Sequence, residues 1–234
     1  EREIIARLIH QRIAVDLGII VRRGDIHGEE AADKAALSHP WQVEMAGPIA
    51  IGPKGRAAFG VFLEAIKEIV PTPPNITLES KMTLFQTLEG GSREIQLRHF
   101  GRAHTGGDVL VWLPDEKIVF TGDMMLPGVA YMGDGHVDEW PATLDGLKEL
   151  DFELWLPGHG PVMRTRKPIH DFQAYLRDLW VKASDMHAAG IDAATAAETL
   201  DMTNHSDNFA QIRAPGVDPR AINRIFSLLD ARAN

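Results

Sequence analysis

Three short stretches carry the clearest signal in this sequence: Gly101-Arg102-Ala103-His104-Thr105-Gly106-Gly107-Asp108, Phe120-Thr121-Gly122-Asp123 and Leu156-Pro157-Gly158-His159-Gly160-Pro161. In each, a side chain that can bind a metal lies near glycine at the end of a predicted strand. A hydrolytic metal site needs neutral imidazoles and carboxylates that project from rigid strand ends into one cleft. Nearby glycines allow the tight turns that such a cleft requires. His104, Asp123 and His159 are therefore candidate metal ligands.

The residues around the first two stretches predict a sheet. Apolar Ile95 and Leu97 alternate with polar residues, which is typical of a half-buried strand. Residues 108–113 and 117–121 form a second pair of strands. The intervening Pro114-Asp115-Glu116 favours a hairpin turn, because Pro and Asp both stabilise turn geometry.

Helices are predicted before, between and after the strands. The apolar spacing favours helices over residues 1–20 and 56–70, the second ended by a cluster of prolines. Pro141 is typical of a first helical turn, and the leucines that follow predict a short helix leading into a strand at residues 152–156.

The last part of the chain is predicted to be helical. An apolar stripe from Ile169 to Ala183 indicates one long helix that ends at Gly190. Asp192 and Asp218-Pro219 are typical of helix beginnings. Alternating strands and helices of this kind favour a layered α/β architecture.

Composition excludes several functional classes. The net charge of −9 disfavours nucleic acid as a partner, because nonspecific binding to it needs clustered Lys and Arg. No apolar run reaches the length of a membrane span, so we expect a soluble protein without a membrane partner. Cysteine is absent, which leaves His, Asp and Glu as the strong metal ligands.

Residues Thr77 to Val162 resemble the second half of the metallo-β-lactamase superfamily. That family has a His in a G-x-x-H-T-x-G-D context, an Asp that ends a T-G-D strand, and a His in P-G-H-G, and all three occur here in the same order. The resemblance implies an α/β fold, the αββα four-layer metallo-β-lactamase sandwich, N-terminally incomplete. It divides the chain into a partial metallo-β-lactamase-fold domain, residues 1–165, and a C-terminal helical extension packed on it, residues 166–234.

The same resemblance implies a role for each ligand. His104 would complete a set of imidazoles around the first metal, Asp123 would join the second metal as the catalytic carboxylate, and His159 would be the last ligand of the second metal. The implied cofactor is zinc, as two ions in the complete site, although iron or manganese accepts the same donors.

One motif of the family does not occur in this sequence. The His-x-His-x-Asp-His cluster, which supplies ligands to both metals, is not found among the ten histidines. Either the chain begins downstream of that cluster, or it is a degenerate member with an incomplete site. We expect the first, because the three downstream ligands are intact. The compartment, cytoplasmic or periplasmic, is left open, since a signal peptide would lie upstream of Glu1.

The resemblance implies a hydrolase that acts on a small molecule: an ester, thioester, lactone or β-lactam. An iron-dependent dioxygenase on the same scaffold and a noncatalytic protein with a defunct site are the alternatives. A nuclease is disfavoured, because the interval between Asp123 and His159 has no room for the domain that nucleic-acid-processing branches insert there. The oligomeric state is left open.

Other polar residues near the motifs receive structural interpretations. His99 is expected to be packed, with a metal ligand as the alternative. Asp108 is expected to shape the turn after His104, with a hydrogen-bond partner of a metal ligand as the alternative. Tyr131 is expected on a surface loop, with donation to an oxyanion in the cleft as the alternative. Three histidines without metal-like spacing are expected to be exposed: His170, His187 and His205.

Overall fold

A computed structural model describes residues 20–21 and 76–233 of the chain. The chain divides into two units, one made of Glu1–Arg22 with Ile76–Asn234 and one of Arg23–Asn75. The described residues all belong to the first unit. The predicted helices at 1–20 and 56–70 lie outside the described residues, except for Ile20, which is part of a short strand.

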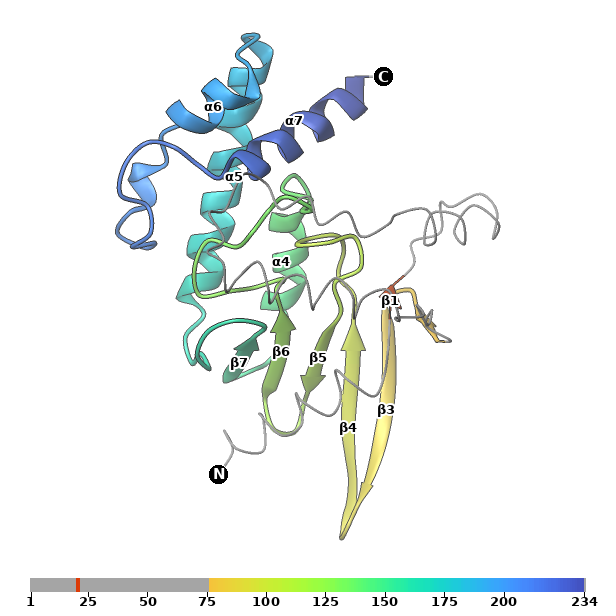
Figure 1. The fold of residues 1–234 in the computed structure, drawn as a ribbon. Helices are drawn as coiled ribbons and strands as arrows, with labels where there is room; N and C mark the ends of the chain where they lie inside the picture. The colour runs from red at the N-terminus through yellow and green to blue at the C-terminus, as the bar shows by residue number, and fades with distance from the viewer. Residues whose placement is uncertain (1–19, 22–75, 234) are drawn as a thin grey trace, which may run out of the picture. The chain divides into compact units, whose positions relative to one another are not determined.

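The first unit contains a five-stranded sheet in the order β3-β4-β5-β6-β7 (Figure 1). Neighbouring strands from β3 to β6 are antiparallel, and β6 and β7 are parallel. A separate two-stranded parallel sheet pairs β1 with β2. The strands are β1 (Ile20–Val21), β2 (Thr77–Leu78), β3 (Lys81–Leu88), β4 (Gly91–Arg98), β5 (Leu110–Leu113), β6 (Ile118–Gly122) and β7 (Leu154–Pro157).

The predicted strands are confirmed. The strand at Ile95 and Leu97 is β4, and the predicted hairpin is the antiparallel pair β5 and β6. Strand β3 was not predicted by itself, because only Met82 and Leu84 pack on a hydrophobic cluster and most of the other β3 residues are exposed.

Helices begin and end where the local signals place them. They are α4 (Trp140–Lys148), α5 (Lys167–Ala188), α6 (Ala193–Thr199) and α7 (Pro219–Ala233), with a 3₁₀ turn η1 (Thr203–His205). Asp192 caps α6, since its side chain accepts a hydrogen bond from the backbone N–H of Thr195 at 3.0 Å. The apolar stripe predicted for α5 is buried along its whole length.

Strands β6 and β7 are buried on both faces. On one face Val119 and Trp155 share a hydrophobic core with helices α4 to α7. On the other face a second cluster contains Ile118, Phe120 and Leu154. A strand buried on both sides is typical of an inner layer, because each face needs its own apolar cover. The two faces are those expected of one sheet in a layered sandwich.

The exposure predicted for the histidines is confirmed at one of three positions. His170 is exposed, but His205 is buried, with Nε2 at 3.0 Å from the Asp178 carboxylate. His187 is half-buried and packs its ring on Phe226. The prediction for His187 and His205 was wrong because spacing along the chain does not report which helices pack against a residue.

None of the described helices has both the length and the apolar character needed to cross a bilayer. The division at residues 165 and 166 stays a prediction. Helix α5, which follows that boundary, contributes side chains to the same core as α4.

Arg166 ties the end of α4 to β7. Its guanidinium donates to the backbone carbonyls of Lys148, Leu150 and Phe152 at 2.9, 2.6 and 3.2 Å. It also lies over the Phe152 ring, 4.0 Å from the centroid. One side chain therefore satisfies three carbonyls in the connection from helix to strand.

We expect Arg166→Met to lower the free energy of unfolding by about 2–3 kcal/mol, because carbonyls lose a charged donor. The matched control is Arg177→Met, whose exposed pairing with Asp145 at 3.8 Å should be worth less than about 1 kcal/mol. Urea denaturation followed by circular dichroism measures both. Equal losses in the two variants would contradict this role.

Candidate metal centre

The parallel pairing of β6 and β7 brings two of the three candidate ligands together. Parallel strands end at the same edge of a sheet, and Gly122 is paired with Pro157 at that edge. The backbone N–H of Gly158 donates to the carbonyl of Gly122 at 2.8 Å. His159 Nε2 consequently lies 3.6 Å from Asp123 Oδ2.

Glycine at position 158 is required by this approach. A Cβ placed there would overlap the Asp123 carboxylate, so no other residue fits without moving one of the two loops. At position 160 the backbone has φ of +110°, and a Cβ would lie 2.8 Å from Pro127 Cγ. The glycines on either side of His159 therefore bring its loop directly onto the segment that follows Asp123.

The N-terminal end of α4 holds the third candidate, His104. The backbone N–H of His136 donates to the carbonyl of Ala103 at 2.8 Å. Thr143 Oγ1 donates to the carbonyl of Arg102 at 2.7 Å, and the Arg102 guanidinium pairs with Glu139. The two residues before His104 are thus fixed by three contacts, two from the start of α4 and one from His136, which precedes the helix.

Trp140 touches both parts of the centre. Its ring lies edge-on to the His104 ring, with centroids 5.8 Å apart, and its indole N–H donates to the carbonyl of Met124 at 2.8 Å. Met124 follows Asp123 directly, and the Trp140 side chain is fully buried. This one residue therefore sets the position of the His104 ring relative to the Asp123 loop.

Asp108 and His99 have the structural roles expected of them. The Asp108 carboxylate accepts from the backbone N–H of Thr105 at 2.8 Å, which closes the loop after His104. Burial raises the pKa of Asp108, and the hydrogen bond from Thr105 opposes that rise. His99 is half-buried, with Nδ1 at 3.0 Å from the carbonyl of Asp108.

Tyr131 lies beside His104 and also contacts the cation of Arg220. The rings of Tyr131 and His104 have centroids 6.1 Å apart, and the Arg220 guanidinium lies 4.7 Å from the Tyr131 centroid. The residue is 39% exposed. Burial and the charge of Asp134 raise the pKa of Tyr131, so its hydroxyl is protonated at neutral pH and can donate.

The described residues contain no group of three or more His, Asp or Glu side chains arranged around one point. Asp123 and His159 form a pair, and His104 packs against Trp140 and Tyr131. The geometry of the pair fits a metal, because two donors at zinc–ligand distance on a tetrahedral ion are about 3.4 Å apart. An imidazole and a carboxylate are also donors that zinc accepts.

Residues 7–159 match the sequence profile of the metallo-β-lactamase superfamily. That segment is more than half of the chain and ends at the last candidate ligand. The chain belongs to the metallo-β-lactamase superfamily. The fold predicted from the three motifs is therefore confirmed, and members of this superfamily are typically hydrolases.

Individual metallo-β-lactamases are similar over shorter segments. The type 2 enzyme of Bacteroides fragilis is 33% identical over 72 residues, which cover 28% of this chain and 29% of that protein. The type 2 enzyme of Pseudomonas aeruginosa is 37% identical over 51 residues, 21% of each chain. The alignments thus span less than a third of the length of these two relatives.

Solved structures share the metallo-β-lactamase fold. The inverting sec-alkylsulfatase Pisa1 from Pseudomonas sp. superimposes with a TM-score of 0.51 at 17% identity, over 65% of this chain and 26% of the sulfatase. A metallo-β-lactamase from Pontibacter korlensis has a TM-score of 0.40 at 21% identity, over 50% of this chain and 54% of that one. At these identities the likeness concerns the fold.

Sequence reasoning missed the part that Trp140 plays at the centre. Its position at the start of a predicted helix gave no sign that its ring and its N–H would contact two separate loops. We expect Trp140→Phe to lower the free energy of unfolding by about 1–3 kcal/mol, because the buried carbonyl of Met124 loses its donor. Thermal and urea denaturation of the variant measure this loss.

Trp112→Phe is the matched control. The Trp112 N–H is buried and has no acceptor within the described part of the chain, so its removal leaves no acceptor unsatisfied. We expect Trp112→Phe to keep the stability of the parent within about 1 kcal/mol. A Trp140→Phe protein as stable as Trp112→Phe would refute the bridging role.

Proposed function

We propose that this protein is a zinc-dependent hydrolase of a small-molecule ester, thioester, lactone or β-lactam. The observation that carries the proposal is the pairing of Asp123 with His159 at the common edge of β6 and β7. His104 lies on a separate loop, and its ring packs against Trp140 at the start of α4. Membership of a superfamily of metallohydrolases supports the reaction class.

The proposed ligands divide between two metal positions. Asp123 and His159 would hold one ion, and His104 would contribute to the other. Zinc held by these residues would supply Lewis-acid chemistry, the activation of a water molecule and of the bond to be cleaved. The His159 side chain is 80% exposed, so a substrate can reach the end of β6 and β7 where Asp123 and His159 lie.

The chain's own residues supply orientation and a hydrogen-bond donor. The N–H of Trp140, through Met124, fixes the loop that carries the Asp123 carboxylate. Tyr131 has a protonated hydroxyl at neutral pH and adjoins His104, so it can donate to negative charge that develops on the substrate. Arg220, stacked on Tyr131, limits where that ring can move.

Metal content tests the ligand assignment. We expect His159→Ala to lose about one metal ion per chain, together with most of the hydrolytic activity, because a terminal ligand is removed. Inductively coupled plasma mass spectrometry should be run on the parent protein and on the variant. His170→Ala, an exposed histidine on α5, is the control and should keep the parent's metal content.

Identical metal content in His159→Ala and His170→Ala would sink the assignment. Hydrolysis of ester and lactam substrates and oxygen uptake should be followed on the same metal-loaded samples. Hydrolysis without oxygen uptake supports the proposal, and oxygen uptake without hydrolysis replaces it with an oxygenase.

A further inference from the structure

A pocket of about 370 Å³ lies between the loop after Asp123, helix α5 and the segment that leads to α7. This volume lies within the range of small-molecule sites. Its walls come from three parts of the chain and include Val129, Tyr175, Met202, Gln211, Arg213 and Val217. These residues lie outside the metal-ligand motifs and have no part in the proposed hydrolysis.

One series of contacts leads to the pocket from His159. The Gly160 backbone lies against Pro127, because a Cβ on Gly160 would be only 2.8 Å from Pro127 Cγ. Gly128 is the next residue, and a Cβ there would lie 3.0 Å from Gln211 Nε2, so the Gln211 side chain rests directly on this loop. Gln211 and Val129 both line the pocket.

A separate series of contacts leads to it from His104. The His104 ring adjoins Tyr131, and the Arg220 guanidinium lies over the Tyr131 ring. The Arg220 guanidinium is paired with Asp218, with donor distances of 2.9 and 2.6 Å. Asp218 also lines the pocket. Contacts therefore link the pocket lining to the residues beside His104 as well as to those beside His159.

The walls combine apolar surface with one available cation. Val129, Met202 and Val217 provide apolar side chains. The Arg213 side chain is exposed, and no carboxylate in the described part of the chain pairs with it. The charge of Asp218 is compensated by Arg220.

Tyr175 adds a neutral donor to the same wall. Burial, together with the charges of Asp218 and Asp178, raises the pKa of Tyr175 to about 12. Its hydroxyl is therefore protonated throughout the physiological range. A ligand that complements these walls has an apolar body and a single negative charge.

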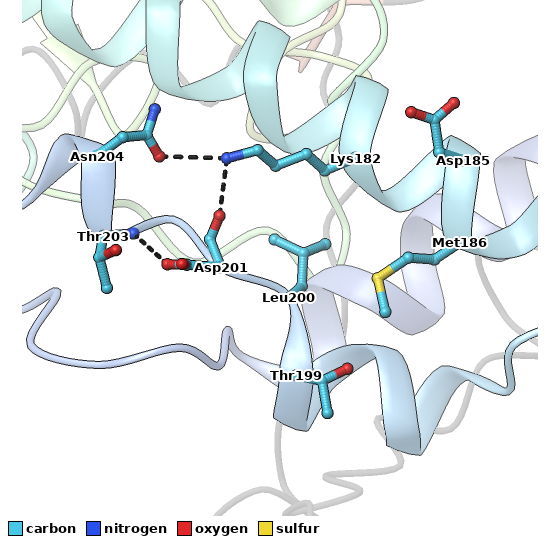
Figure 2. Close-up of a pocket in the computed structure, with 8 residues that line it drawn as sticks. All are labelled: Lys182, Asp185, Met186, Thr199, Leu200, Asp201, Thr203 and Asn204. Atoms are coloured by element: carbon cyan, nitrogen blue, oxygen red, sulfur yellow. Dashed lines mark hydrogen bonds between the residues drawn. The ribbon is translucent and has the colours of Figure 1, made fainter.

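A larger hollow of about 510 Å³ lies elsewhere, between α5, α6 and η1 (Figure 2). Its cation is already engaged, because Lys182 Nζ donates to the carbonyl of Asp201 at 2.7 Å and to Asn204 Oδ1 at 3.2 Å. The carboxylate of Asp178 lies 2.9 Å from the same nitrogen. This hollow therefore offers a ligand no comparable charge.

We propose that the pocket beside Val129 and Arg213 binds the non-reacting part of the substrate, an apolar carbon chain that carries a carboxylate. The apolar chain lies against Val129, Met202 and Val217, and the carboxylate pairs with Arg213. That the bound group is part of a substrate rests on the proposed hydrolase function. That the pocket binds an apolar carboxylate does not depend on that function.

Direct binding to the metal-free full chain tests the pocket separately from hydrolysis. Hexanoate and hexan-1-ol, a charged and an uncharged probe of similar size, are titrated in the presence of EDTA and followed by NMR chemical shifts. We expect hexanoate to bind about tenfold more tightly, as one partly exposed ion pair would allow. We expect Arg213→Gln, a surface change, to abolish that preference.

A variant that fills the pocket tests its location. Val217→Phe should weaken both probes by about tenfold or more, because the added ring occupies the apolar part of the pocket. Val181→Phe, at an exposed position on α5, and Arg177→Gln are the controls and should bind both probes like the parent. Circular dichroism and thermal melting establish that each variant is folded.

Equal affinity for hexanoate and hexan-1-ol, or unchanged binding in both Arg213→Gln and Val217→Phe, would overturn the pocket assignment. If hexanoate binds as expected but the metal-loaded protein hydrolyses nothing, the pocket stands as a binding site and the hydrolase proposal fails. If hydrolysis occurs and neither probe binds, the hydrolase stands and the pocket is rejected.

Discussion

The parallel pairing of β6 with β7 is the constraint on which the candidate centre depends. The two strands are separated along the chain by the segment that contains α4, yet their ends coincide at Gly122 and Pro157. Asp123 and His159 each follow directly from one of these ends, so the sheet sets their separation. Residues that far apart in an unstructured chain would meet only at a large cost in conformational entropy. Here the hydrophobic cores on both faces of the strands stabilise the arrangement.

Helix α4 adds a second level of order to the same edge. It crosses over between the two parallel strands, and its first turn and the segment just before it hold the loop of His104 through side-chain and backbone hydrogen bonds. Trp140 then links this loop to the residue after Asp123. Side chains on rigid elements keep their geometry better than side chains on free loops, because packing fixes their rotamers. The candidate ligands thus depend on a helix that supplies none of them.

The C-terminal helices complete the surroundings of the centre. Helix α5 is packed into the same core as α4, and the segment before α7 folds back over the loop that follows Asp123. Arg220 at the start of α7 lies on Tyr131, which in turn adjoins His104. The last part of the chain therefore contributes side chains both beside the candidate centre and to the hydrophobic core.

The sequence by itself determined the three candidate ligands, the fold family and most element boundaries. These features depend on local patterns: strand alternation, helix caps, and glycines next to a His or an Asp. Tertiary structure alone decided that Asp123 meets His159, that Trp140 joins two loops, that His205 is buried against Asp178, and that Arg213 borders a pocket. Each of these facts depends on contacts between residues distant in sequence, which are set by the packing of whole elements and leave no local signal.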